Sequence, residues 1–226
     1  MKLTLIHGDA LKILPKLKNE KIDLVLTDPP YGIGIAKDGY VGSNKGILAP
    51  LKNYNPQKWD LEPPKKELFD WILKISNHAI IFGGNCLSDR LPVGICWFVW
   101  DKQIPKGFKK SQMELMWTNI KTYPRIYSIL WNGMFRINDE KIYHPTQKPL
   151  YLIKEILREF SHEKDLILDS FLGSGTTMKA CLELNRNCIG IEIDKKYIDI
   201  TKKRLNWGSS LNPDIEFEYI EDESGI

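Results

Sequence analysis

The amino-acid sequence predicts an α/β protein with a single doubly wound, mostly parallel sheet and helices on both of its faces. Short apolar runs alternate along the chain with segments whose apolar residues recur at helical spacing. Nearly continuous apolar runs are typical of parallel strands that are covered on both sides. The chain has 226 residues, which is enough for one sizeable core and too little for two generous ones. We therefore expect one domain over residues 1–226.

Seven apolar runs are expected to form a seven-stranded sheet. They lie at residues 3–8, 21–28, 79–85, 95–102, 113–119, 165–170 and 187–194. In such sheets, ligands bind beyond the carboxyl ends of the strands, near the point where the strand order reverses. Four acidic residues end these runs or lie just beyond them: Asp9, Asp28, Asp169 and Glu192. We therefore expect the functional site at this edge of the sheet.

Helical spacing appears between these runs. It is clear at residues 65–79, 149–161, 176–185 and 195–206, and weak at 11–19, where Pro15 interrupts it. Two stretches lack a period: 32–64, which is rich in Gly, Asn and Pro and is expected to be a long loop, and 119–144, which is expected to be irregular. Loops this long in a compact chain are usually functional or mobile.

Charge is distributed unevenly. The net charge is +3, but residues 212–226 form an acidic tail with six acids and no Lys or Arg, so the rest of the chain carries +9. Residues 101–148 contain nine Lys or Arg and four acids, and they are dense in aromatic residues. Such a segment suits a polyanion whose bases can stack, although an ordinary mixed surface over buried aromatics has the same composition.

Several classes of protein are disfavoured. No apolar run is long enough to span a membrane, and the N-terminus lacks the features of a secretory signal, so we expect a cytoplasmic protein. The four cysteines form no CxxC pair and are expected to be buried hydrophobes, so we expect no metal site.

A glycine-rich turn follows the strand at 165–170. The stretch LDSFLGSGTTMKACLELNRNCIGIEID reads as a strand, a turn with Gly173 and Gly175, a helix, and a strand that ends in Glu192. This order is typical of nucleoside-binding folds, in which an acid binds the ribose. A dinucleotide fingerprint would require glycine where Met178 stands, and no P-loop triplet is present. An adenosyl ligand without phosphates therefore fits better than a dinucleotide.

A second motif, TDPPYGIG, ends the strand at 21–28. Two prolines after a strand fix two backbone angles and remove two donors, which holds the neighbouring groups still.

Together these stretches resemble a known family. TDPPYGIG, LDSFLGSGTT, YHPTQKPLYLI and IHGDA are similar to the motifs of the DNA amino-methyltransferases that modify N6 of adenine or N4 of cytosine. The catalytic motif precedes the cofactor loop, which is the β arrangement of this family. Ser170 departs from the pattern, because the family usually has Pro there, and we expect at most a modest effect. The resemblance implies the S-adenosylmethionine-dependent methyltransferase fold. Loop 32–64 and segment 102–143 lie outside the resemblance and are the candidates for small insertions that contact DNA and recognise the target.

The resemblance also implies roles for particular residues. Asp28, Pro29, Pro30 and Tyr31 would be catalytic: the Asp28 carboxylate and the Pro29 carbonyl accept the amino hydrogens of a flipped-out base, and Tyr31 stacks on it. Lys148 would reach the carboxylate of S-adenosylmethionine, Glu192 its ribose and Asp9 its adenine. The remaining cofactor-binding residues would be Asp28, Asp169, Phe171, Gly173, Gly175, Thr176 and Thr177. The alternative role of Asp9 is to cap a helix.

The expected activity is methylation of adenine N6 in duplex DNA. Methylation of cytosine N4 by the same site is the nearest alternative, and Asp28 favours adenine because cytosine enzymes more often have Ser there. RNA or protein glutamine as substrate, an inactive DNA-binding module and an NAD-dependent enzyme are weaker alternatives. A homodimer and a restriction endonuclease partner remain open.

Overall fold

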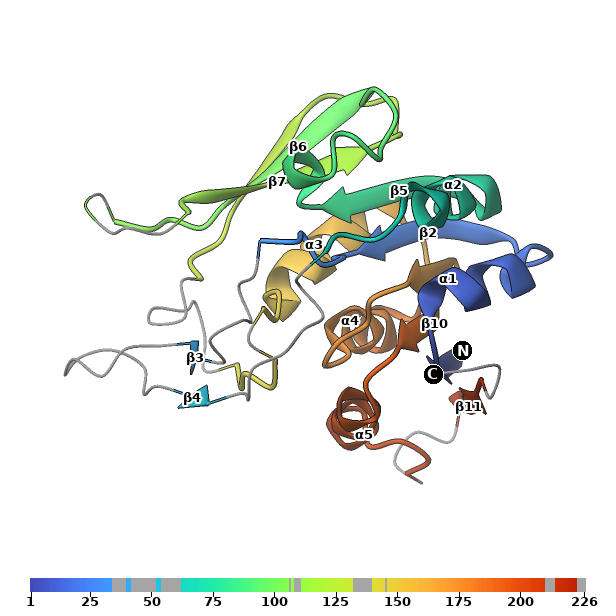
Figure 1. The fold of residues 1–226 in the computed structure, drawn as a ribbon. Coiled ribbons are helices and arrows are strands. Elements are labelled where there is room, and N and C mark those ends of the chain that lie inside the picture. Colours follow the sequence, from blue (N-terminus) through green and yellow to red (C-terminus); the bar gives the residue numbers. More distant parts are fainter. Residues whose placement is uncertain are drawn as a thin grey trace.

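The computed structural model describes residues 1–33, 40–41, 52–53, 62–105, 107, 111–131, 140–144, 146–209 and 214–222. One large sheet forms its centre, in the order β11-β1-β10-β9-β2-β5-β7-β6-β8 (Figure 1). Strand β7 is antiparallel to both of its neighbours, and all other neighbouring pairs of this sheet are parallel. The strands are β1 Lys2–His7, β2 Ile22–Thr27, β5 Ser76–Phe82, β6 Cys96–Asp101, β7 Met113–Thr118, β8 Arg125–Ser128, β9 Leu166–Asp169, β10 Asn187–Glu192 and β11 Glu216–Glu221.

The described residues thus give nine strands in this sheet, where the sequence predicted seven. The seven predicted runs are all present, and β8 and β11 are additional. Strand β8 has only four residues and lies at one edge, in the stretch expected to be irregular. Strand β11 forms the other edge and lies in the acidic tail, where its alternating acids hid the strand pattern. Its acids are partly neutralised by β1, because Lys2 Nζ lies 3.2 Å from Glu216 and 3.1 Å from Glu218.

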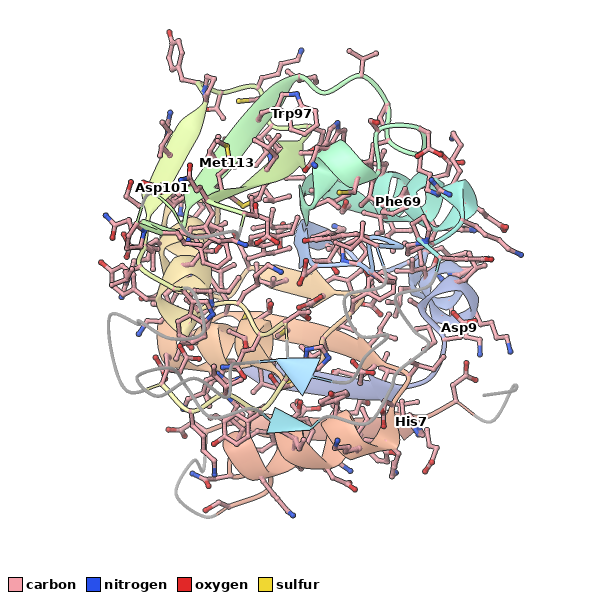
Figure 2. All side chains as sticks on the ribbon, turned by 60° about the vertical axis from the view of Figure 1, so that its left-hand side comes forward. His7, Asp9, Phe69, Trp97, Asp101 and Met113 are labelled. Atoms are coloured by element: carbon pink, nitrogen blue, oxygen red, sulfur yellow. The ribbon has the colours of Figure 1, made fainter. Side chains whose placement is uncertain are left out.

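Helices cover both faces of the sheet, as predicted (Figure 1). Helix α1 (Ala10–Ile13), the 3₁₀ turn Leu14–Leu17 and helix α2 (Lys66–Ile75) pack on one face, where Phe69 (labelled in Figure 2) is fully buried. Helices α3 (Leu150–Phe160), α4 (Thr176–Leu184) and α5 (Lys195–Arg204) pack on the other face. Alternate residues of β2 enter the two cores: Leu24 and Leu26 face α3 and α4, while Val25 faces α1 and α2.

The strand order reverses between β2 and β9. These two strands are neighbours, but the chain leaves β2 toward β5 and leaves β9 toward β10. The two departing connections separate here, which opens a crevice at the carboxyl ends of both strands. The sequence motifs TDPPYGIG and LDSFLGSGTT begin at these two ends, so the fold brings them together.

The predicted insertions are described only in part. Within 32–64, strands β3 (Tyr40–Val41) and β4 (Lys52–Asn53) form a separate antiparallel pair, and most of the loop lies outside the described residues. Within 102–143, strands β7 and β8 belong to the central sheet, and residues 132–139 lie outside the described part. Their role in contacting DNA stays a prediction. None of the helices in the described residues is long and apolar enough to cross a membrane.

Candidate active site

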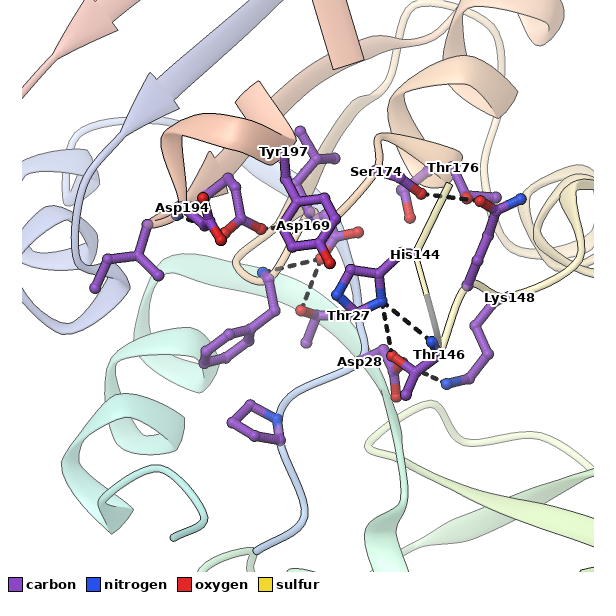
Figure 3. Close-up of a pocket in the computed structure, with 18 of the residues that line it drawn as sticks. Thr27, Asp28, His144, Thr146, Lys148, Asp169, Ser174, Thr176, Asp194 and Tyr197 are labelled. Carbon is purple, nitrogen blue, oxygen red and sulfur yellow. Dashed lines mark hydrogen bonds and ion pairs between the residues drawn. The ribbon is translucent and has the colours of Figure 1, made fainter. Parts of the chain in front are cut away.

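A cavity of about 710 Å³ lies at the carboxyl ends of β2, β9 and β10 (Figure 3). Ligand pockets commonly measure roughly 300–1,000 Å³, so this cavity is large enough for a nucleoside-sized molecule. Its lining combines the two main sequence motifs with the HPTQKP segment. It includes His7, Thr27, Asp28, Pro30, His144, Thr146, Gln147, Lys148, Asp169, Phe171, Gly173, Thr176, Thr177, Glu192, Asp194 and Tyr197.

The glycine-rich turn between β9 and α4 forms one wall of the cavity. Gly173 and Gly175 have φ angles of +54° and +81°, values that side-chain-bearing residues rarely adopt. At Gly175 a Cβ atom would also lie 2.7 Å from Thr201 Cγ2, so the turn packs tightly against α5. Gly175 itself does not line the cavity; it shapes the turn that carries Gly173 and Thr176.

Backbone amides orient Glu192 at the end of β10. Its Oε2 accepts a hydrogen bond from the Gly173 amide at 2.7 Å, and its Oε1 accepts one from the Asp194 amide at 2.8 Å. Burial raises the pKa of Glu192 to about 7, although these amides favour the ionised form. The carboxylate is therefore held in one orientation by atoms that no side-chain substitution removes.

Asp169 joins the end of β9 to the end of β2. Its Oδ1 accepts hydrogen bonds from the Thr27 hydroxyl at 2.8 Å and from the Phe171 amide at 3.1 Å. Burial raises the pKa of Asp169 to about 6. Ser170, which stands where the family usually has Pro, places its hydroxyl 3.1 Å from that of Thr27 and so extends this network.

The TDPPYGIG motif forms the facing wall. Asp28 and Pro30 line the cavity, while Pro29 and Tyr31 do not. The Tyr31 ring instead packs against Gly83, where an added Cβ would approach it to 2.1 Å. Its hydroxyl donates to Asp28 Oδ1 at 2.5 Å, and burial raises the pKa of this phenol well above its ordinary value.

Lys148 is buried against Asp28. It is 8% exposed, and its ammonium forms an ion pair with Asp28 Oδ2 (Figure 3). Burial lowers the pKa of Lys148, but the carboxylates of Asp28 and Glu114 more than offset this, so the pKa is raised and the ammonium keeps its proton. A contact between Lys148 and the carboxylate of a bound cofactor stays a prediction.

Asp9 is placed outside the lining of the cavity. Its side chain caps helix α1 by accepting a hydrogen bond from the Leu11 amide at 2.9 Å. His7, two residues earlier, lines the cavity instead, and Figure 2 labels both residues. The predicted proximity of Asp9 to the adenine of the cofactor is not apparent in this arrangement and stays a prediction.

Sequence reasoning missed several residues of the site. His144 and Gln147 lie within HPTQKP but were not singled out, although that motif was the available signal. The His144 ring contacts the Tyr197 ring, with centroids 4.4 Å apart, and its Nδ1 accepts from the Thr146 amide at 3.2 Å. Burial lowers the pKa of His144 to about 3, with Lys148 adding to the effect, so the imidazole is neutral.

The comparisons with known proteins agree with these motifs. The family model for DNA methylases that modify N6 or N4 matches residues 95–203. The chain is 31% identical to the Type II methyltransferase M2.LlaDCHI of Lactococcus lactis subsp. cremoris, over 91% of this chain and 90% of that protein. It is 27% identical to the DNA adenine methyltransferase YhdJ of Escherichia coli, over 91% of this chain and 83% of that protein. The solved M1.HpyAVI–SAM complex shares the fold, with a TM-score of 0.59 at 24% identity. The match covers 90% of this chain and 99% of that protein.

The chain therefore belongs to the DNA amino-methyltransferase family whose members modify N6 of adenine or N4 of cytosine. The enzyme class and the cofactor that the motifs predicted, a DNA methyltransferase that uses S-adenosylmethionine, are confirmed.

The lining of the cavity fits that cofactor chemically. Its charged side chains include four acids, Asp28, Asp169, Glu192 and Asp194, and two lysines, of which Lys148 is paired with Asp28. A cationic nucleoside without phosphates suits such an acidic lining better than a nucleotide would. No group of three or more His, Cys, Asp or Glu side chains among the described residues is placed to hold a metal ion.

Proposed function

We propose that the protein transfers a methyl group from S-adenosylmethionine to N6 of an adenine that is flipped out of duplex DNA. The observation that carries this proposal is the position of Asp28, which faces the same cavity as Asp169 and Glu192. The first carboxylate comes from the catalytic motif, the second from the start of the cofactor loop and the third from the end of β10. This arrangement supports a role for Asp28 as acceptor of the amino hydrogens, beside the residues that would hold the methyl donor.

Adenine is favoured over cytosine by two observations. The residue before the two prolines is Asp28, whereas cytosine enzymes of the family more often have Ser. One relative that is similar over most of the chain, YhdJ, is named a DNA adenine methyltransferase.

Eight of the ten predicted cofactor residues line the cavity. Besides Asp28 and Lys148, which pair with each other, six of them would hold S-adenosylmethionine: Asp169, Phe171, Gly173, Thr176, Thr177 and Glu192. When bound, this cofactor supplies an electrophilic methyl group on a sulfonium. Glu192 would accept hydrogen bonds from the ribose hydroxyls, because amides already fix its orientation. Phe171 and its apolar neighbours would exclude water from the nucleoside.

The catalytic motif would prepare the nucleophile. The amino lone pair of adenine is delocalised into the ring, so it must be aimed at the methyl carbon. Hydrogen bonds from the two amino hydrogens to the Asp28 carboxylate and the Pro29 carbonyl would favour that geometry. The prolines hold the carbonyl in place before the base arrives, and Tyr31 would stack on the base. The target atom is inaccessible inside a duplex, so the base must leave the stack.

Duplex DNA is the proposed partner, and the basic segment 102–143 with loop 32–64 is its proposed contact. A homodimer, a restriction endonuclease partner and a cytoplasmic location stay predictions. Light scattering of the purified protein tests the first of these.

The function is tested with purified protein, radiolabelled S-adenosylmethionine and duplex DNA of mixed sequence, followed by digestion to nucleosides. The expected result is label in N6-methyl-2′-deoxyadenosine. Label only in N4-methyl-2′-deoxycytidine would overturn the choice of adenine, and absence of label in DNA would overturn the proposed reaction. Mapping of methylated bases in DNA from an expressing host then identifies the target sequence.

A further inference from the structure

Five polar side chains from four segments meet at the catalytic motif, which supplies two of them. We call Asp28, Tyr31, Lys102, Glu114 and Lys148 the Asp28 cluster. Glu114 reaches it because β7 runs antiparallel to β5, which puts the beginning of β7 at the carboxyl edge of the sheet. Two carboxylates and two ammonium groups balance within the cluster.

Both oxygens of Asp28 are engaged within this cluster. Oδ1 accepts the Tyr31 hydroxyl at 2.5 Å, and Oδ2 is paired with the Lys148 ammonium. The proposed reaction, on which this inference rests, requires the Asp28 carboxylate to accept a hydrogen of the target amino group. At least one of the two donors must therefore turn away from Asp28 before the target base can use it.

Glu114 lies within reach of both donors. Its Oε1 is 3.4 Å from the Tyr31 hydroxyl oxygen and 3.8 Å from Lys148 Nζ. Small side-chain movements would bring either donor fully onto this oxygen. The cluster thus contains a second carboxylate that can pair with the hydroxyl or the ammonium that Asp28 releases.

The other oxygen of Glu114 can accept a further hydrogen bond. Oε2 is buried and accepts no hydrogen bond from the described residues. Its nearest cation is Lys102, whose Nζ lies 3.7 Å away. A buried carboxylate oxygen without a donor is unfavourable, so Glu114 gains when a further donor approaches.

We infer that Glu114 is a positioning residue for methyl transfer, and that it takes over the Lys148 ammonium and the Tyr31 hydroxyl when Asp28 turns to the target amino group. The exchange moves no proton off Lys148 and forms no covalent bond. The ammonium keeps a carboxylate partner throughout, so no buried charge is left alone. An ammonium that remained on Asp28 would compete with the amino hydrogens of the base.

The test compares Glu114→Gln with wild type in single-turnover and steady-state methyl transfer. The amide keeps the shape of the side chain but does not neutralise the ammonium. Turnover is expected to fall at least thirtyfold, while KM for DNA and the dissociation constant for S-adenosylmethionine stay within about threefold. Glu114→Asp, which keeps the charge, is expected to recover part of the turnover. Glu183→Gln is the matched control, because Glu183 pairs with Lys154 and Lys179 on the helices α3 and α4, and it is expected to behave as wild type.

A double-mutant cycle shows whether Glu114 acts through Lys148. In a Lys148→Met background, the additional change Glu114→Gln is expected to alter turnover by less than about threefold, because the ammonium that Glu114 receives is gone. The double variant loses the positive charge of Lys148 together with the negative charge of Glu114, so the charges of the cluster stay balanced. It therefore remains informative if Glu114→Gln alone unfolds. Equal losses in both backgrounds would overturn the inference.

The outcomes separate the two proposals. An active wild type with an unaffected Glu114→Gln would overturn the role of Glu114 and leave the proposed function standing; this is the result expected if Lys148 moves to the cofactor carboxylate instead. A wild type that transfers no methyl group to DNA would overturn the proposed function, and the role of Glu114 with it.

Discussion

Glu192 and Asp28 are buried carboxylates on the same cavity, yet different kinds of partner hold them. Two backbone amides, from Gly173 and Asp194, orient Glu192. Side chains from other segments, Tyr31 and Lys148, hold Asp28. The wall around Glu192 comes from one continuous stretch, 169–194, whereas the wall around Asp28 is assembled from residues up to 120 positions apart.

This difference has an energetic consequence. Amides and glycine angles define the Glu192 wall, so its geometry exists before any ligand binds and depends little on charge. The Asp28 wall depends on balanced buried charges, and loss of one partner leaves another uncompensated. We therefore expect substitutions at Asp28 to affect stability and chemistry together, and substitutions at Glu192 to affect cofactor affinity alone.

The largest expected effect is that of Asp28→Ala on methyl transfer. Loss of the acceptor for the amino hydrogens should reduce turnover more than a thousandfold, which corresponds to about 4 kcal/mol. The cofactor dissociation constant, measured by calorimetry, should change less than about threefold. Activity within about tenfold of wild type would contradict the role of Asp28.

The same variant should also be less stable by roughly 1–3 kcal/mol, because Tyr31 and Lys148 lose their acceptor on Asp28 and Lys148 keeps only Glu114 as a partner. The double variant Asp28→Ala/Lys148→Met is the control: it should regain much of the stability in denaturant unfolding and none of the activity. Recovery of activity in the double variant would show that the single loss reflected misfolding.

A smaller effect is expected for the pH dependence of cofactor binding. The ribose hydroxyls require an ionised Glu192, whose pKa burial raises to about 7. As the pH falls from 8 to 6, Glu192 takes up a proton and the affinity for S-adenosylmethionine should decrease by up to about tenfold. His144, with a pKa lowered to about 3, stays neutral throughout this range.

Glu192→Gln separates this effect from titration of the cofactor, whose α-amino group ionises at about pH 7.7–8.0 in model compounds. The variant should bind roughly ten- to a hundredfold more weakly at pH 8. It should lose most of the pH dependence between 6 and 7 and keep only the part that Asp169 contributes through its pKa of about 6. A wild-type profile that persists in the variant would contradict the assignment of Glu192 to the ribose.

Gly175→Ala should reduce stability by about 2–4 kcal/mol. The substitution combines a positive φ angle with a Cβ atom 2.7 Å from Thr201. Gly208→Ala is a matched control, since Gly208 has a φ of +72° and no atom within 4 Å of an added Cβ; it should cost only about 1 kcal/mol. Equal losses in thermal unfolding would show that the contact with Thr201 contributes nothing.

The smallest expected effect distinguishes two helix caps. Asp9 and Asp194 each accept a hydrogen bond at 2.9 Å from the amide two residues on, but only Asp194 lines the cavity. Asp9→Ala and Asp194→Ala should each reduce the free energy of unfolding by about 1 kcal/mol. Only Asp194→Ala should also weaken cofactor binding. Weakened binding in Asp9→Ala would support the predicted proximity of Asp9 to the adenine of the cofactor.

The sequence was sufficient where structure is locally determined. The strand, glycine turn, helix and strand of 165–194 were predicted in order, because periodicity, glycine and terminal acids act within a few residues of each other. It was insufficient at the edges of the sheet. Strand β11 carries acids that resemble a solvated tail until Lys2 is placed beside them, and β8 is too short to show a period.

The candidate site divides in the same way. Asp28, Asp169 and Glu192 were found from the sequence because each follows an apolar run that ends at the ligand-binding edge. Glu114 was not found, because it lies inside a strand and reaches the site only through the antiparallel direction of β7. Lys148 was found in its motif, but its burial against Asp28 was not foreseen.

By itself the sequence determined the family, the α/β fold, and the chemistry of the two motifs, since these depend on residue type and short spacing. The tertiary structure alone decided which partners hold Asp28, which of the two helix-capping aspartates lines the cavity, and where the strand order reverses. Those properties depend on contacts between residues far apart in the chain. A buried charge is stabilised only by the partners around it, and those partners cannot be predicted from the residues next to it in the sequence.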